Sequence, residues 1–309
     1  MRVGHGLYGA RNIRVTDAMV GAVTGALFLA ASGMVFVFGS SYYSLFRTNR
    51  SWLFKIALVV AFAFAAWFTM RSGLDPAFGL LAFAFLAAAA VSFLGAAAGT
   101  WLHRPLGIRD DSLKGIALAK GLEAIVVVGS IVLLMLSFRI PLGDVYLQAG
   151  SLGLGIGIGT GGFVLFAVFA AGQARQMKIP GATIGRLLPW IVLFVFANAF
   201  MEELWFRGLF LRPLVSLLGP IASIVLTAVI FALAHIGASY MSKDERVRFL
   251  IILFPLGLAW GACTYFTDSL IASTLFHAGA DLMIINGFIA SMHGAKPDAA
   301  EAFTSQALG

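Results

Sequence analysis

The 309-residue sequence is poor in charged residues and contains a single cysteine. Asp, Glu, Lys and Arg make up 11% of its positions, whereas they make up about 25% of an ordinary soluble domain. Apolar residues make up 60% of the chain, and the mean hydropathy is +0.94. A water-soluble fold of this composition would have too few polar residues to cover its surface. The scarcity of charge therefore excludes a soluble globular protein.

The lone cysteine, Cys263, cannot form a disulfide within the chain, and we interpret it as a small packing residue. A basic patch with interleaved aromatic residues, as in proteins that bind RNA or DNA, is also missing. The net charge of +7 comes mostly from Lys and Arg between apolar runs. Basic residues in such positions orient membrane proteins and contact anionic headgroups. We therefore expect membrane lipids as partners, and no nucleic acid.

Apolar runs are what the sequence has in abundance. A helix needs about 20 apolar residues to cross a bilayer, and an open strand would leave backbone groups unpaired in lipid. We therefore predict an all-α fold, a polytopic transmembrane helical bundle of about 8–9 spans. The short separation of the last two runs, at "TDSL", allows one of them to be broken or only partly inserted. The runs lie near residues 17–45, 53–70, 77–101, 121–138, 148–172, 187–206, 221–240, 248–267 and 270–290.

The connectors between the runs alternate between basic and weakly charged. The positive-inside rule predicts that the basic connectors are cytoplasmic, which would place the N-terminus outside. The N-terminal tail conflicts with that orientation because it carries Arg2, Arg11 and Arg14, so the sequence leaves the orientation open. The basic connectors are "FRTNRSWLFK", "HRPLGIRDDSLKGIALAKG", "QARQMKIPGATIGR" and "SKDERVR".

The stretch "SLGLGIGIGTGGF" (151–163) contains a GxGxxG pattern at Gly157, Gly159 and Gly162. In dinucleotide-binding proteins this pattern follows a strand within a soluble βαβ unit, which this sequence does not offer. We therefore interpret the glycines as small residues that allow two membrane helices to pack closely.

Ionisable residues inside the runs indicate a functional site, because charge in a membrane is costly. We find the first of them in "NAFMEELWFRGLFL" (198–211). Glu203 and Arg207 are four residues apart on a helix and are expected to pair. Glu202 points about 100° away from Glu203 and is free to face other groups. The alternative is an ordinary ion pair at a helix end.

Two further runs contribute polar groups at helical spacing. Phe231 and His235 share a face in "FALAHIG", and His277 and Asp281 share a face in "FHAGAD". Each histidine alone could simply bond to a neighbouring helix. Polar groups on separate spans avoid lipid by facing one another, so we predict that the three runs form one cluster.

A cluster of Glu, His, His and Asp is compatible with three kinds of function. A carboxylate beside an imidazole can take a proton from water and make a nucleophile, while other groups stabilise an oxyanion. The same residue types could hold zinc as His₂Glu with an open position, although the HExxH motif is absent. An ion-coupled transporter also carries such groups, but it usually has matching halves, which we do not find here.

The motifs "EELWFR" (EExxxR), "FALAH" (FxxxH) and "HAGAD" (Hxxx(N/D)) occur in the order seen in the CPBP family, and the chain resembles that family over about residues 185–290. The family includes type II CAAX prenyl proteases and bacteriocin-processing and immunity membrane proteins. The resemblance divides the chain into an N-terminal membrane-spanning region without recognised motifs (1–180), core helices (181–292) and a C-terminal tail (293–309).

The resemblance implies an intramembrane endopeptidase of glutamate type that cleaves a membrane-associated peptide or protein. It implies that Glu202 activates water together with His235. Glu203 and Arg207 hold the geometry of the first motif, and Phe231 belongs to the second. No cofactor is implied, and zinc is the alternative. The Ala- and Gly-rich composition suggests a bacterial cytoplasmic membrane. A zinc-dependent metalloprotease and a non-enzymatic transporter or immunity protein are the other functions that we consider.

The resemblance further implies that His277 and Asp281 polarise the scissile carbonyl and stabilise the oxyanion. The prenyl-protease branch has Asn where this chain has Asp281, and an ionised Asp cannot donate a hydrogen bond. Asp281 is therefore either protonated, or it orients His277, or this branch works differently. This departure weakens the expectation of prenylated substrates.

Overall fold

The computed structural model describes residues 15–38, 50–102, 105–108, 111–237 and 243–292. The arginines of the N-terminal tail and the predicted C-terminal tail (293–309) lie outside the described residues.

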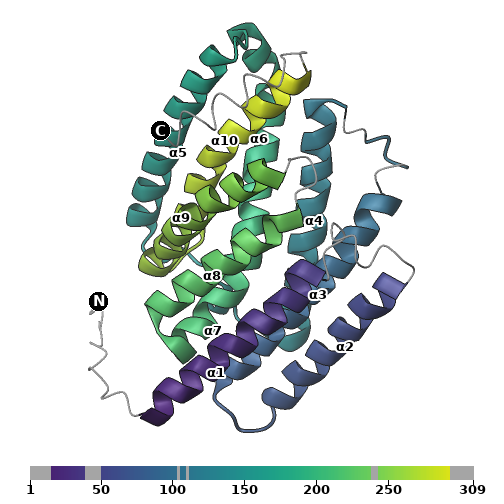
Figure 1. Cartoon of the computed structure of the whole chain (residues 1–309), viewed down its shortest axis with the longest axis vertical. Coiled ribbons are helices and arrows are strands. Elements are labelled where there is room, and N and C mark those ends of the chain that lie inside the picture. Colours follow the sequence, from purple (N-terminus) through teal and green to yellow (C-terminus); the bar gives the residue numbers. More distant parts are fainter. Residues whose placement is uncertain (1–14, 39–49, 103–104, 109–110, 238–242, 293–309) are drawn as a thin grey trace.

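All regular elements in these ranges are helical, and they form one elongated bundle (Figure 1). The N-terminal elements are α1 (Val15–Ser32), the π-helix η1 (Gly33–Phe38), α2 (Arg50–Thr69), α3 (Pro76–Trp101), α4 (Leu113–Phe138), the 3₁₀ turn η3 (Leu142–Val145) and α5 (Leu152–Gln176). The C-terminal elements are α6 (Gly181–Glu203), the π-helix η4 (Leu204–Gly208), α7 (Leu209–Leu218), α8 (Pro220–Ala234), the 3₁₀ turn η5 (His235–Gly237), α9 (Lys243–Thr267) and α10 (Ile271–Met292).

Eight helical stretches in the described ranges are long and apolar enough to cross a bilayer, which confirms the predicted all-α polytopic bundle. One of them, Gly181–Leu218, runs without a break through α6, η4 and α7. The ninth apolar helix, α8, has 15 residues and is only about 22 Å long, whereas the hydrocarbon core is about 30 Å thick. α9 and α10 are both continuous, so the shortened element is α8 and neither of the last two runs.

Successive spans reverse direction along the chain, with α6, η4 and α7 acting as one span and α8 as a short one (Figure 1). The connectors that follow η1, α3, α5 and α8 therefore begin at the same end of the bundle. These are the four connectors with basic sequences. Their location on the cytoplasmic side stays a prediction of the positive-inside rule.

The N-terminal helices share a core with the C-terminal ones. Phe28 of α1, Phe36 of η1 and Phe85 of α3 all contact the ring of Phe210 in α7, with centroids 5.0–6.0 Å apart. A single cluster of buried apolar side chains continues from α1–α4 through η4 and α7 to α8. The core is thus continuous across residue 180, where the motif-free region was predicted to end.

α5 packs closely against α10 through its glycines. A Cβ atom on Gly159 would lie 2.8 Å from Leu275 Cβ, and one on Gly162 would lie 2.5 Å from Phe276 Cγ. A Cβ on Gly157 would meet nothing within 4 Å. Since all three lie within the helix α5, the packing interpretation of the GxGxxG pattern is confirmed for Gly159 and Gly162.

Polar contacts fix the turn that begins α10. Asp268 accepts hydrogen bonds from Arg212 of α7 at 2.6 Å and from Gln148 at 2.5 Å. The Arg212 guanidinium lies 4.2 Å from the centroid of the Tyr146 ring. Burial raises the pKa of Tyr146 to about 12, so the phenol stays neutral beside these charges. The backbone N–H of Leu270 donates to the Tyr146 carbonyl at 3.3 Å, which ties the start of α10 to the α4–α5 connector.

Candidate active site

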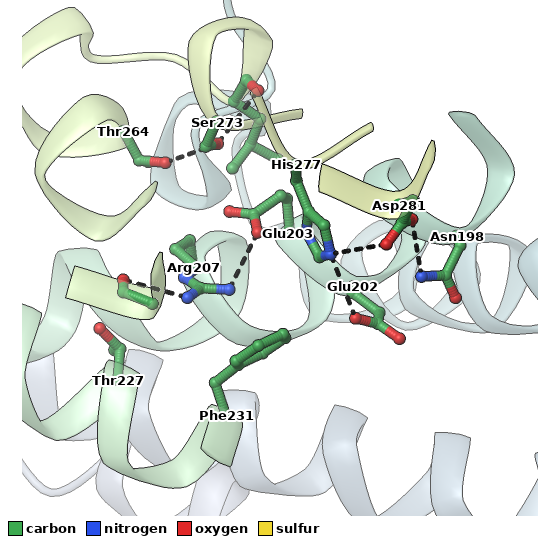
Figure 2. Close-up of polar contacts among 12 residues, drawn as sticks. Asn198, Glu202, Glu203, Arg207, Thr227, Phe231, Thr264, Ser273, His277 and Asp281 are labelled. Carbon is green, nitrogen blue, oxygen red and sulfur yellow. Dashed lines mark hydrogen bonds and ion pairs between the residues drawn. The ribbon is translucent and has the colours of Figure 1, made fainter. Parts of the chain in front are cut away.

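The four predicted catalytic residues come from three helical segments and converge in the interior of the bundle. Glu202 is the penultimate residue of α6, His235 is the first residue of η5, and His277 and Asp281 lie in α10. The helix widens into the π-helix η4 directly after Glu203. Such π-helical turns are frequent at functional sites. Figure 2 shows the carboxylates of Glu202 and Glu203 on different sides of the His277 ring.

The predicted pair of Glu203 and Arg207 is present, with 2.9 Å between Arg207 Nη1 and Glu203 Oε1, and both side chains are fully buried. Arg207 Nη2 also donates to the carbonyl of Gly257 at 3.1 Å. The guanidinium lies 4.5 Å from the Phe231 ring centroid and 5.4 Å from that of Trp260. A cation buried this deeply needs such partners, since an unpaired charge in the interior is strongly destabilising.

Glu203 also holds His277. The distance between His277 Nδ1 and Glu203 Oε1 is 2.9 Å, and a carboxylate accepts, so Nδ1 carries the hydrogen. The Trp260 ring stacks on the imidazole with 3.9 Å between centroids and 11° between planes. With one nitrogen held and the ring packed, the other nitrogen, Nε2, is aimed at Glu202 and Asp281 (Figure 2).

His235 is oriented by the end of its own helix. Its Nδ1 lies 2.8 Å from the carbonyl of Phe231, and a carbonyl accepts, so Nδ1 again carries the hydrogen. This carbonyl belongs to the last turn of α8, where backbone acceptors lack helical partners. The four-residue spacing of "FALAH" therefore lets the histidine bond to the end of its own helix. It leaves Nε2 directed at Glu202.

Glu202 lies between the two imidazoles. Its Oε2 is 3.8 Å from His235 Nε2 and 3.7 Å from His277 Nε2. Both distances exceed a direct hydrogen bond. Oε2 is buried and has no hydrogen-bond partner among the residues that the structure describes. As the sequence predicts, Glu202 takes no part in the pair of Glu203 and Arg207.

Asp281 lies on the other side of His277. Its Oδ1 is 3.7 Å from His277 Nε2, and its Oδ2 accepts a hydrogen bond of 3.0 Å from Asn198 Nδ2. Asn198 belongs to α6, one turn before Glu202. Asp281 is 1% exposed and Asn198 is 7% exposed, so the bond joins α6 to α10 deep in the bundle.

Three residues of this cluster were not predicted from the sequence. Asn198 is a polar residue inside an apolar run, four positions before Glu202, and that spacing was a usable signal. Trp260 and Gly257 lie on α9, and their sequence does not distinguish them from ordinary packing residues. A Cβ on residue 257 would lie 3.2 Å from Arg207 Nη2, so a glycine at this position leaves room for the guanidinium to reach the carbonyl.

The expectation that the first intramembrane ionisable residues occur at Glu202 is wrong. Lys55 lies within the span of α2, and Lys120 and Glu123 lie within the span of α4. Lys120 and Glu123 form an ion pair at 2.8 Å. The predicted run near 121–138 began too late to include Lys120, because α4 starts at Leu113.

Metal binding was considered because the cluster contains the residue types that hold zinc. Among the described residues, no group of three or more His, Cys, Asp or Glu side chains has the arrangement of a metal site. Ligand atoms about 2.0–2.1 Å from a tetrahedral zinc ion would lie about 3.3 Å apart. Glu202 Oε2 is farther than this from both imidazole nitrogens. The zinc alternative thus requires these side chains to move together, and it stays open to measurement.

The arrangement has a clear chemical capacity. One carboxylate oxygen and two imidazole nitrogens from three segments face a common point, and each imidazole is held through its other nitrogen. A carboxylate next to imidazole can accept a proton from water, and protonated groups at the same point can donate to a developing oxyanion.

Residues 184–283 match the family model described as Type II CAAX prenyl endopeptidase Rce1-like. This range includes all seven site residues predicted from the sequence. The search of curated proteins and the search of solved structures each return no match. The match confirms the family that the motif order predicts. The eight apolar helices in the described ranges make the chain an integral membrane protein, and its residues 184–283 resemble the Rce1-like family of CAAX-type intramembrane peptidases.

Proposed function

We propose that the protein is a glutamate-type endopeptidase that hydrolyses a peptide bond in a membrane-associated polypeptide. The observation that carries this proposal is the position of Glu202. Its Oε2 lies within 3.7–3.8 Å of the Nε2 atoms of His277 and His235. A water molecule held between Glu202 and His235 would face two proton acceptors, as general-base catalysis requires.

In this mechanism Glu202 takes a proton from the water, whose oxygen attacks the scissile carbonyl carbon. The carbonyl becomes an oxyanion, and the carbon–nitrogen bond then breaks. Glu202 returns its proton to the leaving nitrogen, so the products are a carboxylic acid and an amine. His235 stays fixed through its bond to the Phe231 carbonyl, and it orients the water through Nε2.

His277 and Asp281 are the proposed oxyanion groups. Glu203 holds His277 by Nδ1, so a proton on Nε2 would point towards the carbonyl oxygen. Arg207 supports this indirectly, because it neutralises Glu203 through their 2.9 Å bond. Preorganised donors of this kind are usually the largest contribution to stabilising a tetrahedral intermediate.

The shortness of α8 supports access from one end of the bundle. The helix ends at His235 after only 15 residues, so this residue lies at bilayer depth if the other end of α8 is at the surface. The side chain of His235 is 21% exposed, against 4% for His277. The end of the bundle towards which α8 runs carries the basic connectors. We therefore propose that the substrate enters from the cytoplasmic side, in a bacterial cytoplasmic membrane.

Comparing membrane fractions from cells with the wild-type protein and with Glu202→Gln tests the function. The expected result is a precursor polypeptide that accumulates uncleaved in the variant, which would also identify the substrate. Equal amounts of both variants in the membrane are the necessary control. If no peptide differs between the two strains, the non-enzymatic transporter or immunity function replaces the proposal.

Elemental analysis separates the glutamate mechanism from its zinc-dependent alternative. The proposal expects purified protein without stoichiometric zinc and with activity that survives a strong chelator. About one zinc ion per chain, lost together with activity in His235→Ala, would instead support a His₂Glu metal site.

A further inference from the structure

A buried hydrogen bond links α6 to α10 beside the proposed catalytic residues. Asn198 Nδ2 donates to Asp281 Oδ2 at 3.0 Å, and Figure 2 shows Asp281 lying between this amide and the ring of His277. The other oxygen, Asp281 Oδ1, faces His277 Nε2 at 3.7 Å. The two oxygens of Asp281 therefore have different surroundings.

We propose that Asn198 is a positioning residue that keeps the proton of Asp281 on Oδ1, the oxygen that faces His277. This inference rests on the proposed function, because it assigns Asp281 a donor role in the same site. It adds to that function a residue outside the three motifs, located one helical turn before Glu202.

The chemistry of the amide gives Asn198 this effect. Its N–H group only donates, and unlike an imidazole or carboxyl it keeps its hydrogen over the whole physiological pH range. A carboxyl oxygen that accepts this bond cannot also carry a proton pointing at the same N–H. When Asp281 is protonated, its hydrogen therefore sits on Oδ1. The O–H then points towards the space beside His277 Nε2 and Glu202.

The charged groups around Asp281 make the location of this proton important. His277 comes from the same helix, Glu202 from α6 and Lys120 from α4, and all three interact electrostatically with Asp281. The carboxyl and imidazole atoms of Asp281, Glu202 and His277 offer several positions on which a proton can reside. The amide of Asn198 is the neutral donor of this set. Because it donates to Asp281 Oδ2, that oxygen is no longer a position that a proton could occupy.

Kinetics in a double-mutant cycle tests the proposal on the full chain in detergent. The probe is a quenched fluorescent peptide with a farnesylated CAAX cysteine. Asn198→Leu keeps the approximate size and removes the donor, and we expect kcat to fall about tenfold or more with little change in KM. In the Asp281→Ala background the same substitution should change kcat less than about twofold, because coupled residues are not additive.

Asn286→Leu is the matched control. Asn286 is also a buried asparagine between helices, and it donates to the Ala170 carbonyl at 2.7 Å and to Gln173 at 3.0 Å, away from the cluster. Its effect should be the same with and without Asp281→Ala. If Asn198→Leu lowers kcat by the same factor with and without Asp281→Ala, as this control does, Asn198 has only a structural role and the proposal is overturned.

Infrared difference spectroscopy across pH tests the same bond without any substrate. The protonated carboxyl band of Asp281 is the one absent from Asp281→Asn. We expect Asn198→Leu to move this band and the pH at which it titrates, whereas Asn286→Leu leaves both unchanged. An unmoved band in Asn198→Leu would overturn the inference. If no polypeptide differs between membranes with the wild type and with Glu202→Gln while the band moves, the proposed function fails and the proton-placing role of Asn198 stands.

Discussion

The helices before residue 180 and those after it both cross the membrane, but they hold their ionisable side chains differently. In the N-terminal helices, Lys120 and Glu123 form a partly exposed pair one turn apart on α4. In the C-terminal helices, a single oxygen of Glu203, Oε1, accepts hydrogen bonds both from Arg207 and from His277 of another helix. The first arrangement concerns a single helix, whereas the second fixes two helices relative to each other.

This difference shows how a membrane protein can bury charge and use it. The hydrogen bonds that offset the cost of burying Glu203 also aim His277 at Glu202. The N-terminal helices help to position the C-terminal ones by packing. Their aromatic side chains pack on α7, and the glycines of α5 let α10 approach closely. We therefore expect substitutions of charged residues to affect chemistry mainly in the C-terminal region, with Lys120, which interacts electrostatically with Asp281, as the exception. Substitutions that change side-chain size should affect chemistry in both regions.

The largest expected effect is that of Glu202→Gln. The amide cannot accept a proton from water, so kcat should fall about 10²–10⁴-fold while the protein stays folded. Glu123→Gln is the matched control, because it also removes a glutamate from within a span, and it should change kcat less than about threefold. Rates on one cleavable peptide, with thermal unfolding as a check of folding, measure both. Equal activity in the wild type and Glu202→Gln would remove Glu202 from the mechanism.

Substitutions of Asp281 should have the next largest effect and distinguish its two possible roles. If Asp281 donates to the oxyanion, Asp281→Ala should lower kcat about 10²–10³-fold, the usual effect of losing one such donor. Asp281→Asn should then retain most activity, since the carboxamide offers an N–H. We expect this outcome, because Glu203 already fixes the orientation of His277. Steady-state rates equally low in both variants would instead mean that Asp281 acts as an acceptor.

Helix geometry explains which features of the site the sequence could predict. The pair of Glu203 and Arg207 follows from their four-residue spacing, as does the separate direction of Glu202. The same reasoning placed His277 and Asp281 on one face of α10, and His277 Nε2 lies 3.7 Å from Asp281 Oδ1. Contacts within one helix are thus fixed by the helical repeat.

Contacts between helices depend on packing that a single sequence does not reveal. Glu203 and His277 are 74 positions apart, and their bond depends on the rotation of α6 against α10. The stacking of Trp260 on His277 depends in the same way on α9. The end of α8 was misplaced because apolar residues continue past His235 in the sequence. Likewise, the roles of Glu202 and His235 in catalysis stay predictions until they are measured.

Arg207→Met should lower stability more than activity per folded molecule. The substitution leaves the buried Glu203 carboxylate without its cation, and breaking a buried pair costs about 3–5 kcal/mol. Lys120→Met is the control for the N-terminal region. The pair of Lys120 and Glu123 is partly exposed, with side chains 29% and 40% accessible, so its loss should cost less than about 1 kcal/mol. Denaturation of both variants in the same detergent gives the comparison. Equal losses of stability would contradict the contrast between the two regions.

The smallest expected effect concerns the glycines of α5, and it tests whether the N-terminal region reaches the site through shape. In Gly159→Ala the new methyl group would lie 2.8 Å from Leu275 Cβ and 3.0 Å from the Ala272 carbonyl, so α10 must move. Overpacking of this kind costs about 1–3 kcal/mol. His277 follows Leu275 by two residues on the same helix, so kcat should fall along with stability. Gly157→Ala, two residues away in the same motif, meets nothing within 4 Å and should stabilise α5 by up to about 1 kcal/mol. Unfolding curves and cleavage rates of the two variants separate the outcomes. Loss of stability in Gly159→Ala with an unchanged kcat would show that α5 supports the fold without positioning α10 for catalysis.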